Sequence, residues 1–257
     1  MSDQSDTTLM VLGHGSSKHT ESSASVRSHA KLLSQTNKYA DVQVAFLKED
    51  PLIESCLDNI KTAHVTIVPD FLAEGYFTRQ VIPRLLNLSE RKNSIQCSPP
   101  VGTHPMMSEL LNDAAEGVMG DWKPQDTSLF VVGHGSVKNS CSKQTMLHHL
   151  ASLRQAACWA QVTDLWLEEP PKVSEWHDLC NETKVIVVPY LLNDGQHGGW
   201  DIPIDLGLER GALVHGVTHI LGGRNVRIAP ALGTSPRFAK AVDALAEMWG
   251  EKTGKSQ

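Results

Sequence analysis

Two histidines in glycine-rich surroundings carry the residue type best suited to metal chemistry. His134 lies between Gly133 and Gly135, and His197 lies in the glycine-rich stretch 195–199. Imidazole is the commonest metal ligand among protein side chains, and it titrates near neutral pH. Two imidazoles that face each other can hold a divalent ion and leave coordination positions open for exchange. We therefore take His134 and His197 as candidate metal ligands and as candidate acceptors of protons.

The surroundings of His134 occur twice in the chain. Residues 11–16, Val-Leu-Gly-His-Gly-Ser, return at 131–136 as Val-Val-Gly-His-Gly-Ser, a shift of 134 − 14 = 120 residues. Further segments related by the same shift are 65–72 and 185–192, and 81–83 and 201–203. A constant period of this length indicates a duplicated structural unit. We expect two tandem domains, residues 1–122 and 127–257, joined by a polar segment that contains a proline.

Two segments depart from this regular spacing. Residues 47–51 resemble 167–170 with one residue lost. Residues 101–105 resemble 232–236 at a larger shift, 233 − 102 = 131. The second copy should therefore carry about eleven extra residues, in the glycine-rich stretch 206–224.

Each copy alternates strand-like and helix-like segments. The strands are short and rich in β-branched residues, and the helices show apolar residues at mixed spacings of three and four. This alternation predicts an α/β fold, in which each domain is a small parallel sheet flanked by helices. The expected strands are 8–12, 42–47, 65–68 and 94–97 in the first copy, and 128–132, 162–167, 185–188 and 226–229 in the second; the expected longer helices are 22–35, 106–119, 143–157 and 236–249.

This arrangement would place both histidines at one edge of a sheet. Ligands of open parallel sheets bind beyond the carboxyl ends of the strands. His134 directly follows a first strand, and His197 lies in the loop after a third strand. Glycines beside His134 would allow a sharp turn and the close approach of a ligand to the backbone. We therefore expect ligand contacts from Gly133, Gly135 and Ser136, and stacking of a planar ligand on Trp200.

The first copy keeps only part of this constellation. His14 corresponds to His134, but Phe77 stands where His197 stands, and phenylalanine cannot bind a metal or carry a proton. His14 remains a further candidate ligand, which His104 could join, although a surface histidine before a proline-started helix is the simpler interpretation of His104.

Several other charged or basic residues have two interpretations. Asp201 could orient His197 or cap the following helix. The pair Glu168-Glu169 is interpreted as the exposed end of a strand. His215 and His219 have a spacing that could bind a metal on a helix, but the neighbouring glycines favour a loop.

Composition excludes several classes of function. The 257 residues carry 23 Lys and Arg against 29 Asp and Glu, a net charge of −6, which argues against a nucleic-acid partner. We expect no membrane partner and a cytoplasmic location, because no apolar run approaches about 18 residues and the first residues are polar and acidic. The five cysteines are widely spaced and form no CxxC pair, which argues against a disulfide framework and a cysteine zinc site. No phosphate-binding loop is present, so we expect no nucleotide cofactor.

The order of these motifs resembles the CbiX/SirB family of class II tetrapyrrole chelatases. The shared features are a strand followed by Gly-His-Gly-Ser, a later apolar strand with Gly-x-His, then Ile-Pro and a Leu-Gly-x-x-Pro block. The resemblance covers nearly the whole chain as two copies. It implies insertion of a divalent metal, Co²⁺, Fe²⁺ or Ni²⁺, into sirohydrochlorin or a related tetrapyrrole without ATP. The metal is then a substrate.

Carried onto this sequence, the family's histidine pair falls on His134 and His197. The competent site would lie in the second copy, whereas typical two-domain members have it in the first. A second departure is Gly198-Gly199-Trp200, where relatives carry a more charged stretch. The carboxylates of the tetrapyrrole would need local cations, for which the candidates are Arg79, Arg224, Arg227 and Arg237.

Two classes of function stay open at this point. The first is a metal chelatase, and the second is a non-catalytic carrier of metal or tetrapyrrole that descends from one. The intact histidine pair favours the enzyme. The chain could act as a monomer or as a homodimer, and a tandem pair could supply internally what a single-domain relative builds by dimerisation.

Overall fold

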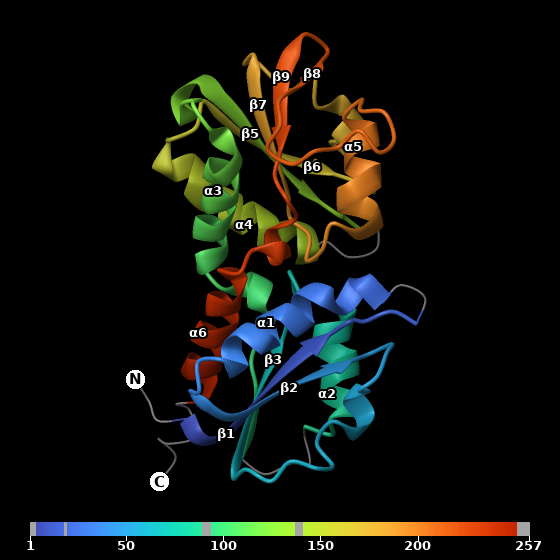
Figure 1. Ribbon diagram of the computed structural model, residues 1–257, viewed down its shortest axis with the longest axis vertical. Coiled ribbons are helices and arrows are strands. Elements are labelled where there is room, and N and C mark those ends of the chain that lie inside the picture. The colour runs from blue at the N-terminus through green and yellow to red at the C-terminus, as the bar shows by residue number, and fades with distance from the viewer. Residues whose placement is uncertain (1–3, 18–19, 89–93, 137–140, 251–257) are drawn as a thin grey trace. The chain divides into compact units, whose positions relative to one another are not determined.

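The computed structural model describes residues 4–17, 20–88, 94–136 and 141–250. The chain forms two compact units (Figure 1). Unit 1 contains Met1–His104 together with Pro236–Gln257, and unit 2 contains Pro105–Ser235. Within the described residues, no helix is both long and apolar enough to cross a membrane.

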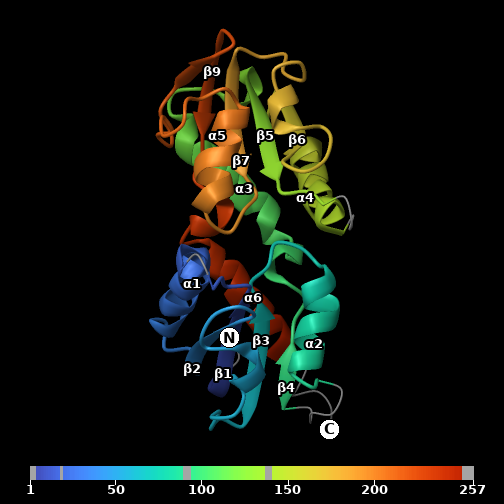
Figure 2. The same cartoon turned by 90° about the vertical axis from the view of Figure 1, so that its right-hand side faces the viewer.

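Unit 1 is built on a four-stranded parallel sheet in the order β2-β1-β3-β4. The strands are β1 (Gln4–Gly13), β2 (Tyr39–Phe46), β3 (His64–Pro69) and β4 (Ile95–Cys97), and the α-helices are α1 (Ala24–Ser34), α2 (Ile82–Leu85) and α6 (Phe238–Gly250). Side chains alternate between the two faces of a strand. Met10 and Leu12 of β1 accordingly pack with Ile82 and Leu86, at α2, in one apolar cluster. Helices α1 and α6 lie against each other on the other side of the sheet (Figure 2).

Unit 2 repeats this plan with one additional strand. Its sheet has the order β6-β5-β7-β9-β8 and is parallel except for β8, which runs antiparallel to β9. The strands are β5 (Thr127–Gly133), β6 (Gln161–Trp166), β7 (Lys184–Pro189), β8 (His219–Leu221) and β9 (Arg224–Ile228), and the α-helices are α3 (Met106–Met119), α4 (Cys141–Ala156) and α5 (Ile202–Asp205). The predicted α/β class with two parallel-sheet domains is confirmed, and β8 is the strand that the sequence patterns missed.

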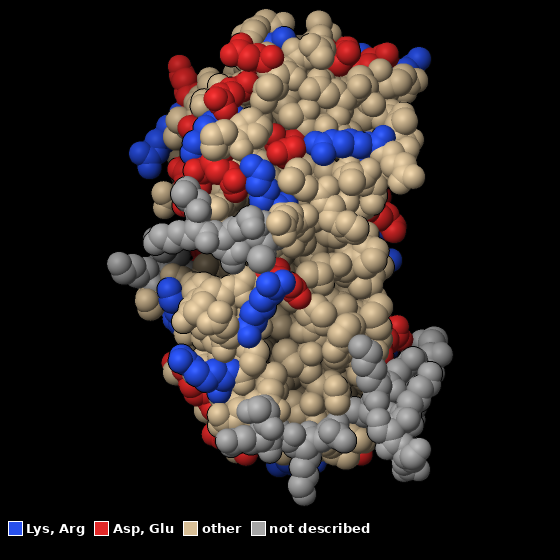
Figure 3. Space-filling model, turned by 180° about the vertical axis from the view of Figure 1, so that it is seen from behind, with Lys and Arg blue, Asp and Glu red and all other residues tan. Residues whose placement is uncertain are grey.

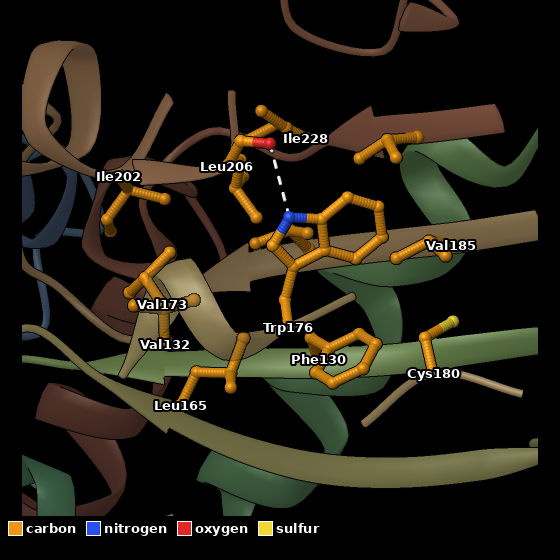
Figure 4. Close-up of a cluster of buried hydrophobic side chains, with 12 residues drawn as sticks. Phe130, Val132, Leu165, Val173, Trp176, Cys180, Val185, Ile202, Leu206 and Ile228 are labelled. Atoms are coloured by element: carbon orange, nitrogen blue, oxygen red, sulfur yellow. Dashed lines mark hydrogen bonds between the residues drawn. The ribbon is translucent and has the colours of Figure 1, made fainter. Parts of the chain in front are cut away.

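The core of unit 2 on the α5 side of the sheet is centred on Trp176 (Figure 4). Its indole N–H donates a hydrogen bond of 3.2 Å to the Leu206 carbonyl, while the ring packs among buried side chains of β5, β7 and β9. A buried tryptophan normally finds a partner for this donor, because leaving it unpaired in an apolar core is costly. The bond ties the end of α5, which follows His197 along the chain, to the core.

The two copies match residue by residue up to the end of this helix. The Leu206 amide donates to the Ile202 carbonyl and that of Leu208 to Pro203, as Leu86 donates to Ile82 and Leu88 to Pro83. The match resumes in the fourth parallel strand, where Val226 pairs with Val185 as Ile95 pairs with Val65. The predicted insertion is therefore confirmed and lies within residues 209–225, here called the inserted segment, which includes β8.

The closing helices of the two copies are exchanged between the compact units. Helix α3, from the first copy, packs on β7 and α4 in unit 2, whereas α6, from the second copy, packs on β1, β3 and α1 in unit 1. The expected boundaries, 1–122 and 127–257, therefore delimit the sequence repeat and not the compact units. Local sequence patterns indicate that a helix has an apolar face but not which copy of the sheet will cover it.

Polar contacts hold each exchanged helix in place. Asp243 of α6 accepts hydrogen bonds from Lys38 Nζ at 2.7 Å and from the Tyr39 hydroxyl at 2.6 Å. Burial and the neighbouring Asp243 raise the pKa of Tyr39, so this hydroxyl keeps its proton and acts as a donor. At the end of α3, the Arg227 guanidinium donates to the Val118 and Met119 carbonyls and lies 4.0 Å from the centre of the Trp122 ring.

The exchange predicts which unit a mutation in α6 will destabilise. Phe238 is fully buried and stacks on His29 of α1, with ring centres 4.9 Å apart. Phe238→Ala should cost about 3–5 kcal/mol of stability, because a buried aromatic ring leaves a cavity when removed. In hydrogen exchange followed by mass spectrometry, we expect faster exchange in β1 and unchanged exchange in β5. Faster exchange in β5 with β1 unaffected would contradict the exchanged arrangement.

Candidate functional site

The loop after β5 holds His134 at the carboxyl edge of the sheet, and the glycines on either side of it give the loop its shape. A Cβ atom on Gly133 would lie 2.5 Å from the Trp166 ring. Gly135 has φ +75°, a conformation that residues with a side chain rarely adopt. The Ser136 amide donates to Glu169 Oε1 at 3.1 Å. These contacts give all three residues a part in shaping the loop, while their direct contact with a ligand stays a prediction.

Glu169 is the fixed support of this loop. Burial alone would raise the pKa of its carboxyl group, but hydrogen bonds from Lys143 and from the Ser136 amide outweigh that effect and lower it. The Lys143 ammonium lies 3.0 Å from Glu169 Oε2. Glu169 is therefore an ionised structural residue that accepts hydrogen bonds from the loop.

The two candidate histidines use the same ring nitrogen for a hydrogen bond within the protein. His134 Nδ1 lies 3.0 Å from the Gly135 carbonyl oxygen, and His197 Nδ1 lies 2.7 Å from Asp201 Oδ2. Both partners are oxygen atoms that accept hydrogen bonds, so Nδ1 carries the proton in each neutral ring. The lone pair is then on Nε2, which is the form of imidazole that binds a metal. Of the two interpretations of Asp201, the structure supports the one in which it orients His197.

The rings of His134 and His197 lie next to each other. Their centres are 4.9 Å apart and their planes are inclined by 84°. Each side chain is 46% exposed, so an ion or a larger ligand can reach the pair from solvent. The structure thus brings together the two histidines that the sequence singled out.

A single wide helical turn, His197–Asp201, aims His197 at its partner. The turn is a π-helix, in which the Gly198 and Gly199 amides both point to the Asp194 carbonyl. Pro203 has no amide hydrogen, and its ring would clash with the carbonyl four residues earlier in a regular α-helix, so a wider turn precedes it. The same π-turn, Phe77–Val81, precedes Pro83 in unit 1. Such turns are frequently found at functional sites.

Glu168 adds a carboxylate that sequence reasoning had placed only at the exposed end of a strand. Its Oε1 atom lies 3.9 Å from His134 Nε2, and its amide donates to the His134 carbonyl at 3.0 Å. The available signal was its position two residues after β6, which neighbours β5 at the same edge. Among the described residues, no three His, Cys, Asp or Glu side chains converge closely enough to enclose a metal ion. The site is therefore an open edge with two imidazoles and two nearby carboxylates, those of Glu168 and Asp201.

Unit 1 reproduces the geometry of this edge without its chemistry. His14 Nδ1 lies 2.9 Å from the Gly15 carbonyl oxygen, and the His14 and Phe77 ring centres are 5.0 Å apart at 82°. The Ser16 amide donates to Glu49, as Ser136 donates to Glu169. The frame is conserved between the copies, but the second imidazole is replaced by a benzene ring.

Two further replacements follow from the backbone hydrogen bonds. The Lys48 amide donates to the His14 carbonyl as the Glu168 amide donates to that of His134, so Lys48 corresponds to Glu168. Val81 likewise stands at the position of Asp201, at the end of the π-turn. The expectation that one residue is lost between 47–51 and 167–170 is therefore wrong, because the shift is still 120 at Lys48 and Glu168.

The remaining histidine candidates have other surroundings. Burial lowers the pKa of His104, which favours its neutral form, and the residue follows a short helical turn, Val101–Thr103. His215 Nε2 lies 3.7 Å from Asp194 Oδ2, and His219 begins strand β8 with its Nε2 3.3 Å from the Val214 carbonyl oxygen. His215 lies in a loop, as the neighbouring glycines indicated, whereas His219 lies in a strand and the expectation of a loop was wrong there.

Most of the arginines proposed for carboxylate binding have protein partners. Arg224 donates to the carbonyls of His177, Cys180 and Glu182. Arg227 is held at the end of α3, as described above, and the Arg79 guanidinium is paired with Glu74. The patterns missed Arg210, whose guanidinium carbon lies 5.1 Å from the centre of the Trp200 ring.

The role of Asp201 can be tested by metal binding. Asp201→Asn removes the carboxylate that holds the Nδ1 proton of His197, and losing such a partner typically lowers metal affinity 10- to 100-fold. Isothermal titration with Co²⁺ should show this loss. The matched control is Val81→Asp, at the corresponding position of unit 1, which should leave Co²⁺ affinity unchanged. Equal affinity of Asp201→Asn and the unaltered protein would exclude the orienting role.

Comparison with known proteins agrees with the geometry of the two copies. The model of the CbiX family matches residues 8–117 and again 128–247. A probable sirohydrochlorin cobaltochelatase of Halobacterium salinarum is 31% identical over 258 residues, which cover 91% of this chain and 88% of that protein.

Among solved structures, SirB from Bacillus subtilis with Fe³⁺ has a TM-score of 0.76 at 17% identity and covers 97% of this chain and 98% of its own. DR2241 from Deinococcus radiodurans, a multi-domain protein with structural similarity to chelatases, has a TM-score of 0.80 at 23% identity, and this chain spans 54% of it. These structures share the fold. With the family model matching both halves, the chain belongs to the CbiX family.

Proposed function

We propose that the chain is a metal chelatase that inserts a divalent ion into sirohydrochlorin or a related tetrapyrrole at the edge formed by His134 and His197. The proposal rests on the observation that both imidazole rings hold their proton on Nδ1 and leave Nε2 free. Each Nδ1 atom faces an acceptor, and both rings are exposed, which leaves two Nε2 lone pairs for an incoming ion. The name of the Halobacterium relative supports sirohydrochlorin as the substrate class.

The metal ion is a substrate that must be held and then released. Two imidazoles leave most of the coordination positions of a divalent ion to water, which a macrocycle can displace. A closed cage of protein ligands would retain the ion. The absence of a third tightly converging ligand among the described residues supports transfer rather than storage.

Insertion also requires the removal of protons. A metal-free tetrapyrrole carries two pyrrole N–H groups, so each M²⁺ ion that enters releases two H⁺ and leaves the macrocycle core neutral. An imidazole is suited to accept such protons because its ordinary pKa is close to neutral pH. We assign this role to whichever of the two histidines is not holding the ion when the N–H group approaches.

Glu168 and Asp201 support both steps electrostatically. The carboxylate of Glu168, 3.9 Å from His134 Nε2, attracts a divalent cation to the pair and stabilises the imidazolium that forms on proton transfer. Asp201 stabilises the same charge on His197 through the hydrogen bond at Nδ1. Both carboxylates are partly exposed, so a proton can pass on to water.

The proposal needs no nucleotide. The free energy of insertion comes from replacing two N–H bonds and a hydrated ion by four metal–nitrogen bonds, and the sequence contains no phosphate-binding loop. Imidazole and carboxylate groups accept Co²⁺, Fe²⁺ and Ni²⁺ alike, so we propose all three as substrates, with supply setting the choice.

The assignment to the second copy is tested by a matched pair of variants. His197→Ala should lower kcat for Co²⁺ insertion into sirohydrochlorin by about 10²–10⁴, the usual contribution of a positioned acid–base group. His14→Ala, at the corresponding edge of unit 1, should change kcat less than twofold. The reaction is followed anaerobically through the change in absorption on metallation.

Three outcomes of this assay contradict the proposal. A large loss for His14→Ala with little loss for His197→Ala would place the site in the first copy. Absence of any acceleration by the unaltered protein would overturn the chelatase function. Binding of the tetrapyrrole without metallation would identify a carrier instead.

A further inference from the structure

The inserted segment places an arginine on an aromatic side chain of the candidate site. The guanidinium carbon of Arg210 lies 5.1 Å from the centre of the Trp200 ring. Trp200 is 41% exposed, and Arg210 is exposed as well. Stacking restricts a guanidinium group to a plane while its N–H edges stay open to a ligand.

The inserted segment is attached to unit 2 on both sides of Arg210. Before it, the Leu208 amide donates to the Pro203 carbonyl at 2.9 Å; after it, the Gly216 amide donates to the Ile228 carbonyl at 3.1 Å. The neighbouring Gly211 has φ +82°, which permits the sharp turn beside the Trp200 ring. The stretch of chain that carries Arg210 is therefore attached to unit 2 at both ends.

The segment and the turn that carries His197 share an anchor. The Asp194 carbonyl accepts the Gly198 and Gly199 amides of that turn, and its carboxylate accepts the Ala231 amide at 2.8 Å. The other carboxylate oxygen lies 3.7 Å from His215 Nε2, in the inserted segment. Asp194 thus links the position of the inserted segment to that of the histidine turn.

Arg210 is also the arginine of unit 2 whose donors are uncommitted among the described residues. The other three are used by the protein: Arg154 bonds to Val162 and Asp164, and Arg224 and Arg227 bond to the carbonyls described above. On the face seen in Figure 3, Lys and Arg lie among Asp and Glu, and much of the visible surface is uncharged. In a chain with a net charge of −6, an anion is better recognised by a single placed cation than by a broad field.

The Trp200–Arg210 pair occurs only in the copy that has the histidine pair. Trp200 lies in the same π-turn as His197, and the first copy has Gln80 at that position. The aromatic member of the pair is thus absent where the second imidazole is absent.

We propose that Arg210, held on Trp200 by the inserted segment, binds a carboxylate of the tetrapyrrole while the macrocycle lies at His134 and His197. The pair selects for carboxylated macrocycles by adding binding energy for the substrate. This inference rests on the proposed chelatase function and adds a specificity-determining residue to it. The chemistry is that of a planar guanidinium, which donates two parallel hydrogen bonds to one carboxylate.

The test compares variants of the full-length protein in the Co²⁺ insertion assay with sirohydrochlorin varied. Arg210→Gln should raise KM about five- to tenfold and leave kcat within twofold, because a charge-assisted hydrogen bond to bound substrate is lost. Arg210→Lys should have a KM between those of the unaltered protein and Arg210→Gln, because lysine keeps the positive charge but lacks the planar guanidinium that donates two parallel hydrogen bonds. Lys184→Gln, which removes one positive charge at the amino end of β7, is the control and should leave KM unchanged.

A second substrate separates recognition of the carboxylate from a structural effect. With sirohydrochlorin whose carboxylates are methylated, the unaltered protein and Arg210→Gln should have the same KM. An unchanged KM of Arg210→Gln for sirohydrochlorin, or a penalty that persists with the methyl ester, would overturn the inference while metallation itself continues.

The contact between Arg210 and a carboxylate can also be tested if the protein does not insert metal into sirohydrochlorin. Metal-free sirohydrochlorin is then titrated against the protein and followed by absorption. A five- to tenfold weaker Kd for Arg210→Gln supports the carboxylate contact without turnover. An equal Kd, or no binding to either protein, overturns it.

Discussion

The hydrogen bonds at the two Nδ1 atoms are the interactions on which the site depends. An imidazole has two nitrogens, and only the deprotonated one binds a metal ion. The Gly135 carbonyl and the Asp201 carboxylate both fix the proton on Nδ1, so both rings offer Nε2. The glycine turn, the π-turn and the support from Glu169 keep these two contacts in place. Without them, the histidines would be adjacent but not oriented for the same ion.

The two copies share the backbone and loop contacts that form the frame of the site, but they differ in the side chains that could bind a metal. Unit 1 keeps the glycine turn, the histidine with its Nδ1 contact and the glutamate that accepts the Ser16 amide. It has Phe77, Lys48 and Val81 where unit 2 has an imidazole and two carboxylates. The ring geometry is almost the same in the two copies, at 5.0 Å and 82° against 4.9 Å and 84°. The frame therefore forms without metal-binding residues, and side-chain identity alone distinguishes the two edges.

Much of this could be predicted from the sequence because it is local or repeated. The strand-Gly-His-Gly pattern placed His134 at a sheet edge, the constant shift of 120 related Phe77 to His197, and the larger shift near the end of each copy located the insertion. Contacts between segments distant in sequence were not predictable in this way. The role of Glu168 depends on β6 lying beside β5, and the exchange of α3 and α6 depends on which sheet covers each helix.

The arginines show the same limit of sequence patterns. Arg224 and Arg227 were chosen for their charge, but carbonyl groups of helix and loop ends take up their donors. Arg210 was not among the candidates, because its contact with Trp200 depends on how the inserted segment folds and is not visible in the sequence. Charge in a sequence indicates what a side chain can bind, and the fold decides whether its donors remain available.

We propose that the two copies share the backbone frame of the site and that three side chains of unit 2, Glu168, His197 and Asp201, confer metal binding on it. The most direct test is to transfer them to the first copy, as Lys48→Glu, Phe77→His and Val81→Asp in one chain, and to count bound Co²⁺ by isothermal titration. We expect a second equivalent of Co²⁺, which His14→Ala then removes. A triple variant that melts like the unaltered protein but binds no second ion would contradict it.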